Sequence, residues 1–150
     1  SSFLETPSLK KFLIDEKNKG LDTNQPYDEF RNNVFEFKIQ IRELLDKIHN
    51  KKEMILGYGA STKGNVILHF CDITSKDIPY IAEVNTDKFG CYTPGTLIPI
   101  ISEQEARKMN PDYFFVLPWH FKEFILKKEK TRPNNKTALI FPLPVIETYR

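Results

Sequence analysis

A glycine-rich turn between an apolar strand and an apolar helical pattern constrains this sequence more than any other feature. The turn spans residues 57–65 and reads Gly-Tyr-Gly-Ala-Ser-Thr-Lys-Gly-Asn, after the apolar run 54–56 and before the apolar run 66–68. Glycine permits backbone conformations closed to other residues and lets a ligand approach the main chain. A helix that begins in such a turn offers unpaired N–H groups and the positive end of its dipole to an anion. The segment therefore predicts binding of a phosphorylated ligand, with a nucleotide as first choice.

The glycine spacing separates this turn from two familiar phosphate loops. Gly57 and Gly59 match the start of the dinucleotide motif G-x-G-x-x-G, but the third glycine falls at Gly64 instead of Thr62. A Walker loop needs Gly-Lys-Ser/Thr in that order, and here Lys63 precedes the glycine. The turn still carries a cation, two hydroxyls and an amide that suit phosphate oxygens. We predict a ligand-binding loop, with a plain strand-to-helix turn as the alternative; its residues are Gly57, Tyr58, Gly59, Ala60, Ser61, Thr62, Lys63, Gly64 and Asn65.

Composition limits the class of protein. The 150 residues are 40% hydrophobic and 28% charged with a net charge of +2, as in an ordinary globular domain. No dense Lys/Arg stripe, bilayer-length apolar run or signal-peptide pattern is visible, so we expect neither nucleic acid nor a membrane as partner. Cys71 and Cys91 lack metal-ligand spacing, so we expect reduced thiols, no metal and a cytoplasmic location. The sequence starts at Ser1 without Met, which leaves open that it is a piece of a longer chain.

Apolar periodicity predicts helices before the glycine-rich turn and an alternating pattern after it. Residues 4–18 form a first predicted helix that stops at Gly20, and residues 27–50 form a longer lead-in helix with apolar side chains at steps of three and four. Predicted strands at 54–56, 78–85, 112–117 and 137–141 then alternate with predicted helices at 65–71, 102–109 and 120–130, before a Pro-rich tail.

This alternation predicts an α/β fold: a Rossmann-like three-layer domain with a mostly parallel sheet, preceded by one or two helices. We expect an N-terminal helix and connector at 1–26 and the Rossmann-like domain at 27–150, whose sheet core covers 54–150. Ligands of such sheets bind at the carboxyl ends of the strands. Segments 57–65, 83–88 and 118–121 should therefore meet in one site.

Further candidate residues follow the second and third predicted strands. Glu83 stands near the position where a Rossmann domain holds an acid on the ribose hydroxyls, although a solvated carboxylate is the simpler interpretation. We add Asn85 and Lys88 to the substrate-binding set. In the tripeptide Pro118, Trp119 and His120, the indole can stack on a base or sugar, or it can simply cover the end of the sheet. His120 is only a weak catalytic candidate, because no paired acid or nucleophile is evident.

Five ordered motifs resemble the C-terminal domain of the sugar C-methyltransferase family. They are the loop 57–65, Asn-Thr-Asp-Lys-Phe-Gly at 85–90, Thr-Pro-Gly-Thr-Leu-Ile-Pro at 93–99, Pro-Asp-Tyr at 111–113 and Leu-Pro-Trp-His-Phe at 117–121. The resemblance implies a parent enzyme with a zinc-binding domain, a central domain that binds S-adenosylmethionine and performs methyl transfer, and this Rossmann-like domain. It also implies that the C-terminal domain helps to bind a nucleotide-diphosphate sugar, commonly a thymidine-diphosphate deoxysugar.

We therefore expect the substrate-binding part of a methyltransferase, without the zinc and S-adenosylmethionine domains. On this interpretation the chain itself binds no cofactor, and a methyl-donor domain in cis or in trans is its partner. One alternative is a small NAD-dependent oxidoreductase that uses Glu83, against which the displaced third glycine counts. The other is a non-catalytic interaction module whose long helix forms the partner surface.

Overall fold

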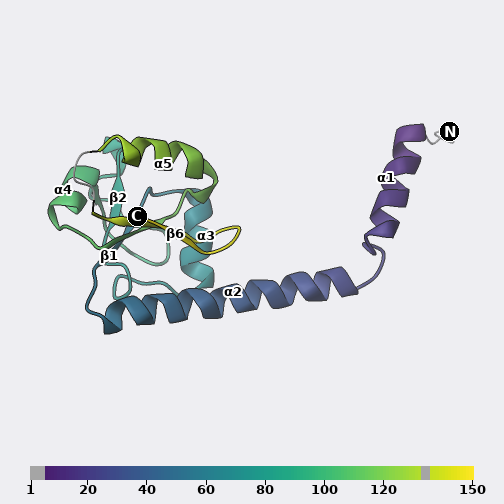
Figure 1. Ribbon diagram of the computed structural model, residues 1–150, viewed down its shortest axis with the longest axis horizontal. Helices are drawn as coiled ribbons and strands as arrows, with labels where there is room; N and C mark the ends of the chain where they lie inside the picture. The colour runs from purple at the N-terminus through teal and green to yellow at the C-terminus, as the bar shows by residue number, and fades with distance from the viewer. Residues whose placement is uncertain (1–5, 133–135) are drawn as a thin grey trace. The chain divides into compact units, whose positions relative to one another are not determined.

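The computed structural model describes residues 6–132 and 136–150 (Figure 1). The chain divides into two compact units, residues 1–39 and residues 40–150, so the division falls inside the long helix α2 (Gln25–Asn50). The predicted lead-in helix is therefore present. The predicted domain boundary between residues 26 and 27 marks the start of the lead-in helix, whereas the two compact units meet at residue 39. That domain boundary stays a prediction.

The first unit contains α1 (Pro7–Asn18) and the N-terminal part of α2. The hydroxyl of Thr6 caps α1 by accepting the N–H of Leu9, and Pro7 occupies the first turn, where its missing N–H is harmless. Gly20, at φ +67°, follows the helix end as predicted. The predicted start at Leu4 lies outside the described residues. None of the residues of α1 is buried.

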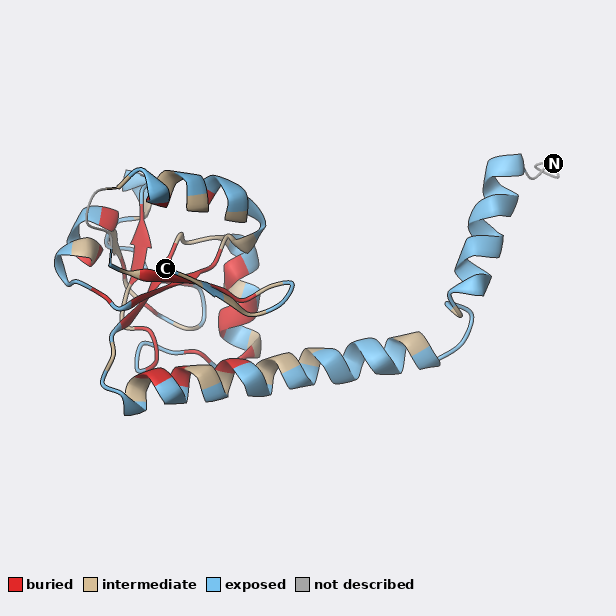
Figure 2. Ribbon diagram, in the orientation of Figure 1, coloured by how far each residue is buried: buried red, intermediate tan, exposed pale blue. Residues whose placement is uncertain are grey.

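The second unit begins with the C-terminal part of α2, which is anchored by its apolar stripe. Ile41, Leu45 and Ile48 are buried, as the three- and four-residue spacing predicted (Figure 2). A guanidinium–carboxylate pair, Arg42 to Asp77 at 2.8 Å, adds a polar contact with the loop before the second strand. This part of α2 therefore belongs to the core of the α/β domain.

A six-stranded sheet forms the centre of the domain, in the order β3-β2-β1-β4-β5-β6. Its strands are β1 (Ile55–Tyr58), β2 (Ile81–Glu83), β3 (Ile100–Ser102), β4 (Tyr113–Val116), β5 (Ala138–Phe141) and β6 (Glu147–Tyr149). The first five strands pair in parallel and β6 is antiparallel to β5. This strand order is that of the Rossmann fold, with the switch point between β1 and β4. The predicted fold class is confirmed.

Helices cover both faces of the sheet. On one face, α4 (Glu103–Lys108) and α5 (Lys122–Lys130) pack against the sheet. Leu56, Phe114 and Phe141 of the strands form a buried apolar cluster with Ala106 of α4 and Ile125 of α5. Figure 1 shows α5 on one side of the sheet and the C-terminal part of α2 on the other. The helix α3 (Thr62–Phe70) follows the glycine-rich turn. Two short 3-10 helices, η1 (Thr86–Lys88) and η2 (Trp119–Phe121), complete the set.

Several boundaries differ from the predictions for identifiable reasons. The second strand is only three residues long, because Pro79 has no N–H for a ladder and the N–H of Ile78 bonds the Thr74 carbonyl instead. Helix α3 starts three residues early, since Ser61 caps it. The predicted capping box of Ser102 and Glu105 is present. Strands β3 and β6 were not predicted, because three residues after a Pro-containing segment give too short an apolar signal.

Candidate functional site

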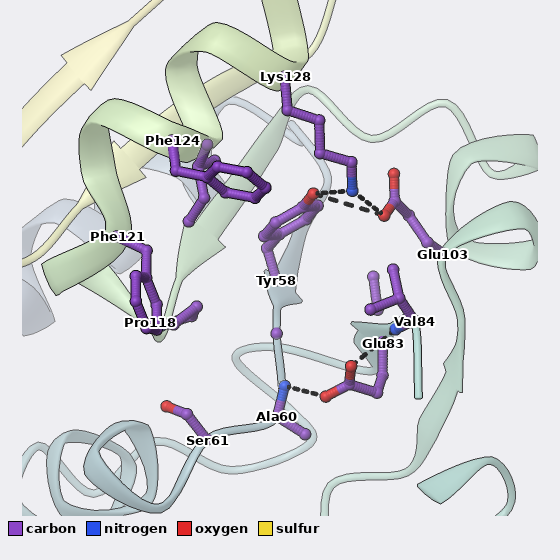
Figure 3. A pocket seen from close by; sticks show the side chains of 13 residues that line it. Tyr58, Ala60, Ser61, Glu83, Val84, Glu103, Pro118, Phe121, Phe124 and Lys128 are labelled. Carbon is purple, nitrogen blue, oxygen red and sulfur yellow. Dashed lines mark hydrogen bonds and ion pairs between the residues drawn. The ribbon is translucent and has the colours of Figure 1, made fainter. Parts of the chain in front are cut away.

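A cavity of about 530 Å³ opens at the carboxyl ends of β1, β2 and β4, which is the predicted edge of the sheet (Figure 3). One wall is the start of the glycine-rich turn, and another is the 3-10 helix η2 with the following α5. The side chains of Pro118, Phe121 and Phe124 border it opposite Val84. Because its lining is mostly apolar and partly aromatic, we call it the aromatic cavity.

The glycine-rich turn keeps its shape because two of its glycines leave no room for a side chain. Gly59 has φ +77°, and a Cβ there would lie 2.8 Å from the ring of Pro118. A Cβ on Gly64 would lie 2.5 Å from Leu117 Cβ, so α3 packs directly against the end of β4. Both glycines are thus required for close packing.

Ser61 is the N-cap of α3, and its hydroxyl accepts the N–H of Gly64 at 3.0 Å. The next carbonyl bond of the helix joins the N–H of Asn65 to the Ser61 carbonyl. Among the described hydrogen bonds, none takes the backbone N–H of Thr62 or Lys63. These two groups are the orphan donors that a helix N-terminus offers to an anion.

Glu83 does not project freely toward the cavity but fixes the glycine-rich turn. Its Oε1 accepts the N–H groups of Val84 and Asn85 at 2.7 and 3.0 Å, and its Oε2 accepts the N–H of Ala60 at 2.9 Å. The Lys88 ammonium lies 3.3 Å from Oε2 and donates to the Ala60 carbonyl at 2.8 Å. Both backbone polar groups of Ala60 are therefore held by one ion pair. All four acceptor positions of the carboxylate are used.

Burial raises the pKa of Glu83, but the N–H groups of Asn85 and Val84 and the Lys88 ammonium lower it by more. The net shift is downward, so the carboxylate is ionised at neutral pH. Its charge is compensated by Lys88, and the pair as a whole does not repel an anion at the neighbouring helix start.

A buried polar cluster closes the far end of the aromatic cavity. The Lys128 ammonium donates to the Tyr58 hydroxyl at 2.9 Å and to Glu103 Oε2 at 2.8 Å. Arg107 pairs with both Glu103 and Glu129, at 2.8 and 2.7 Å. Burial lowers the pKa of Lys128, while Glu103 and Tyr58 raise it by more, so Lys128 stays charged. Burial raises the pKa of Tyr58 despite the opposing effect of Lys128, and its hydroxyl stays neutral.

A second cavity, of about 460 Å³, adjoins the same turn and the start of α3. Ala60 and Ser61 line it as they line the aromatic cavity, and its remaining lining is largely polar, including Thr62, Asn65 and Tyr92. We call it the polar cavity.

Each predicted site residue lines the aromatic cavity, lines the polar cavity, or lies outside both, and Ala60 and Ser61 line both cavities. Tyr58, Gly59, Ala60, Ser61, Glu83 and Pro118 line the aromatic cavity, whereas Ala60, Ser61, Thr62, Asn65 and Lys88 line the polar one. Gly57 and Gly64 are buried in the packing behind the turn, and Lys63 and Asn85 are exposed outside both linings. Trp119 packs against the core cluster, and the exposed ring of His120 lies between the rings of Trp119 and Phe121.

Glu103, Phe124 and Lys128 line the aromatic cavity but were not among the predicted site residues, and Phe121 was included only as the end of segment 118–121. The two phenylalanines carried a usable signal, since a pair of aromatics three apart directly after a strand end is placed at the carboxyl edge. Glu103 and Lys128 gave none, because they reach the cavity from helices whose packing angles the sequence does not specify.

Comparison with known proteins decides the family. The sequence profile described as the C-methyltransferase C-terminal domain matches residues 2–144 of this chain. The chain belongs to this family. It is similar to the C-methyltransferase NovU of Streptomyces niveus, with 31% identity over 138 residues, which are 92% of this chain and 33% of that protein. The chain therefore spans about one third of the length of that curated relative. The resemblance found in the motifs is confirmed.

Two further features of this C-methyltransferase C-terminal domain concern metals and membranes. In the part of the chain that the structure describes, no three His, Cys, Asp or Glu side chains gather where they could hold a metal ion. Within residues 6–132 and 136–150, no helix has both the length and the apolar character that crossing a membrane requires.

Proposed function

We propose that this chain is the substrate-binding domain of an S-adenosylmethionine-dependent sugar methyltransferase, and that it binds a nucleotide-diphosphate sugar at the carboxyl edge of its sheet. One observation carries the proposal: the aromatic cavity lies at the switch point of a Rossmann-like sheet and is bounded by a glycine-rich turn that opens a helix. Clefts at this point of open α/β sheets are where ligands bind.

The start of α3 suits the diphosphate. The helix has nine residues, and the N–H groups of Thr62 and Lys63 at its first turn take no acceptor among the described residues. The hydroxyl of Thr62 and the ammonium of Lys63 lie next to these groups in sequence and are exposed, so they can turn toward phosphate oxygens. Backbone donors, a hydroxyl and a cation together match the charge-assisted bonds that phosphate favours.

The engaged state of Glu83 counts against a dinucleotide and agrees with a thymidine-diphosphate sugar, whose deoxyribose lacks the 2′-hydroxyl that this acid would accept. A Rossmann domain that binds NAD uses the acid after the second strand to accept the ribose hydroxyls. Here that carboxylate already accepts from Ala60, Val84, Asn85 and Lys88. A ribose could displace one of these donors only by leaving it unsatisfied, which costs about 1–3 kcal/mol. The same argument applies to the ribose of S-adenosylmethionine, so we assign the methyl donor to another domain, in cis or in trans.

On this proposal the chain binds and orients the sugar, and the methyl-donor domain carries out the transfer. His120 could at most assist, because it is exposed and contacts only the rings of Trp119 and Phe121 in the described contacts. The observation that favours an interaction module instead is the exposed apolar surface of the first unit, where Phe12 is 67% and Phe30 is 69% exposed.

Calorimetric titration of the chain with thymidine-diphosphate glucose, NAD and S-adenosylmethionine tests the proposal. We expect binding of the sugar nucleotide and none of the other two. Binding of NAD alone would replace the proposal by a dehydrogenase-like function. If none of the three ligands binds and the chain self-associates in a way that Phe30→Ser abolishes, the interaction module would be favoured. The fluorescence of Trp119, the single tryptophan, gives an independent readout of the same titration.

A further inference from the structure

Two cavities of different chemistry adjoin the same short stretch of chain. The aromatic cavity has about 530 Å³ and the polar cavity about 460 Å³, and Ala60 and Ser61 line both. In this stretch, the N–H and the carbonyl of Ala60 are held by the Glu83–Lys88 pair, and Ser61 caps α3. Ala60 and Ser61, the two residues that both cavities share, are therefore fixed in place by hydrogen bonds.

We propose that the two cavities are halves of one divided binding site, and that a single ligand lies across Ala60 and Ser61. Its flat, unsaturated ring occupies the aromatic cavity and its hydroxyl-bearing sugar occupies the polar cavity. This inference rests on the proposed function, which supplies the ligand class. It adds which end of the nucleotide sugar lies in which cavity.

The aromatic cavity fits a base because it presents uncovered aromatic rings in a mostly apolar lining. Phe121 and Phe124 border it and are 56% and 69% exposed, so their rings are accessible to a ligand (Figure 3). Every base has a π-face that can stack on such rings. Tyr58, the Lys128 ammonium and the Glu103 carboxylate at the far end bond to one another.

The polar cavity fits a sugar because three of its polar side chains are available. Thr62, Asn65 and Tyr92 line it, and no hydrogen bond among the described residues engages their side-chain polar atoms. A hydroxyl, an amide and a phenol offer both donors and acceptors, which sugar hydroxyls require. The reverse orientation would strip water from several hydroxyls in the aromatic cavity without replacing those bonds, and unpaired burial of a hydroxyl is unfavourable.

Ligand truncation tests the division. Wild-type chain, Phe124→Ala and Asn65→Ala are titrated by calorimetry with thymidine diphosphate and with thymidine-diphosphate glucose. We expect Phe124→Ala to weaken both ligands by the same factor, about 5- to 100-fold, because both carry the base. We expect Asn65→Ala to weaken only the sugar nucleotide, by about 3- to 10-fold, because thymidine diphosphate has no hexose to lose.

Matched controls come from the first unit. Phe30 is 69% exposed, like Phe124, and the amide of Asn33 is exposed on the same helix, so Phe30→Ala and Asn33→Ala should leave both affinities unchanged. Phe121→Ala provides a second aromatic variant should Phe124→Ala melt early by circular dichroism. Equal losses for both ligands in Asn65→Ala, or a loss in Phe124→Ala confined to the sugar nucleotide, would overturn the division and leave the proposed function intact. Failure of the wild-type chain to bind either ligand would overturn both.

Discussion

Replacement of Glu83 by glutamine removes the anion on which the conformation of the glycine-rich turn depends. The carboxylate accepts three backbone N–H groups between 2.7 and 3.0 Å and pairs with Lys88 at 3.3 Å. A glutamine amide keeps one acceptor oxygen and turns the other position into a donor. Whichever way the amide is oriented, its NH₂ group faces at least one backbone N–H, and that N–H loses its acceptor.

The expected cost follows from these contacts. A hydrogen bond to a charged group contributes about 1.5–3 kcal/mol, and the same bond to a neutral group about 0.5–1.5 kcal/mol. The ion pair with the half-exposed Lys88 adds little by itself. With one or two bonds lost and the others weakened, we expect the free energy of unfolding to fall by about 2–4 kcal/mol. Because domains of this size have about 5–15 kcal/mol of stability, the variant should still fold.

Urea unfolding of wild type, Glu83→Gln and Glu43→Gln measures this difference. Glu43 is an exposed residue of α2, and its replacement changes the net charge equally, so it should alter the free energy of unfolding by less than about 0.5 kcal/mol. Amide hydrogen exchange at Ala60 reports on the turn itself, and its protection should drop in Glu83→Gln. A variant as stable as the control, with the amide of Ala60 still protected, would refute the role assigned to Glu83.

The pH dependence gives a second check on the same residue. The pKa of Glu83 in the folded chain lies below its ordinary value of 4.5, so the unfolded chain binds the proton more readily. The stabilisation is therefore complete above about pH 4.5 and is lost as the pH falls through the lower pKa of the folded state. We expect the difference in unfolding free energy between wild type and Glu83→Gln to shrink in that acidic window. A difference that stayed constant down to pH 3 would contradict the assigned shift.

Four further substitutions test other parts of the structure. Gly59→Ala forces a side chain into a positive-φ position and should cost about 1–3 kcal/mol in urea unfolding; a neutral effect would contradict the described turn. Leu45→Ala opens a cavity in the domain core and should cost about 2–5 kcal/mol. The exposed Ile39 provides its control, and equal effects of Leu45→Ala and Ile39→Ala would mean that α2 is not anchored. Ser61→Ala removes the cap of α3 and should lower the unfolding free energy by about 1 kcal/mol. Lys63→Ala should weaken a sugar nucleotide several-fold in calorimetry, because a charge-assisted bond contributes about 1.5–3 kcal/mol, and unchanged affinity would remove Lys63 from the site.

The fold was largely predictable because its signals are local. Continuous apolar strands, a glycine-rich turn and a capping box each depend on a few neighbouring residues, and together they specify a parallel sheet with helices on both faces. Strand β3 escaped prediction because it has only three residues and is defined by its pairing with β2. Strand β6 escaped prediction because it is defined only by its pairing with β5, as in the register of Tyr149 with Leu139. Its sequence alone carries no such information.

The site was predictable only in outline. The topology brought the turn, Glu83 and Pro118 to one edge, as expected for the carboxyl ends of β1, β2 and β4. What the side chains do there depends on distances between segments. From the sequence, the Glu83 carboxylate could bind a ribose or the backbone, and the structure distinguishes the two by its backbone contacts, including the 2.9 Å bond from the N–H of Ala60.

That contact bears on how a Rossmann-like sheet can serve a ligand other than a dinucleotide. By accepting from the turn, Glu83 gives up the bond that would recognise a ribose, and in return the turn is ordered before any ligand arrives. Binding then requires less loss of conformational freedom, since the donors at the start of α3 are already in position. Because Lys88 neutralises the carboxylate, the remaining unpaired N–H groups of Thr62 and Lys63 set the electrostatic preference at this edge, and that preference is for an anion. Recognition beyond the anion must come from the side chains of the two cavities, which is why their different chemistry is the feature to test.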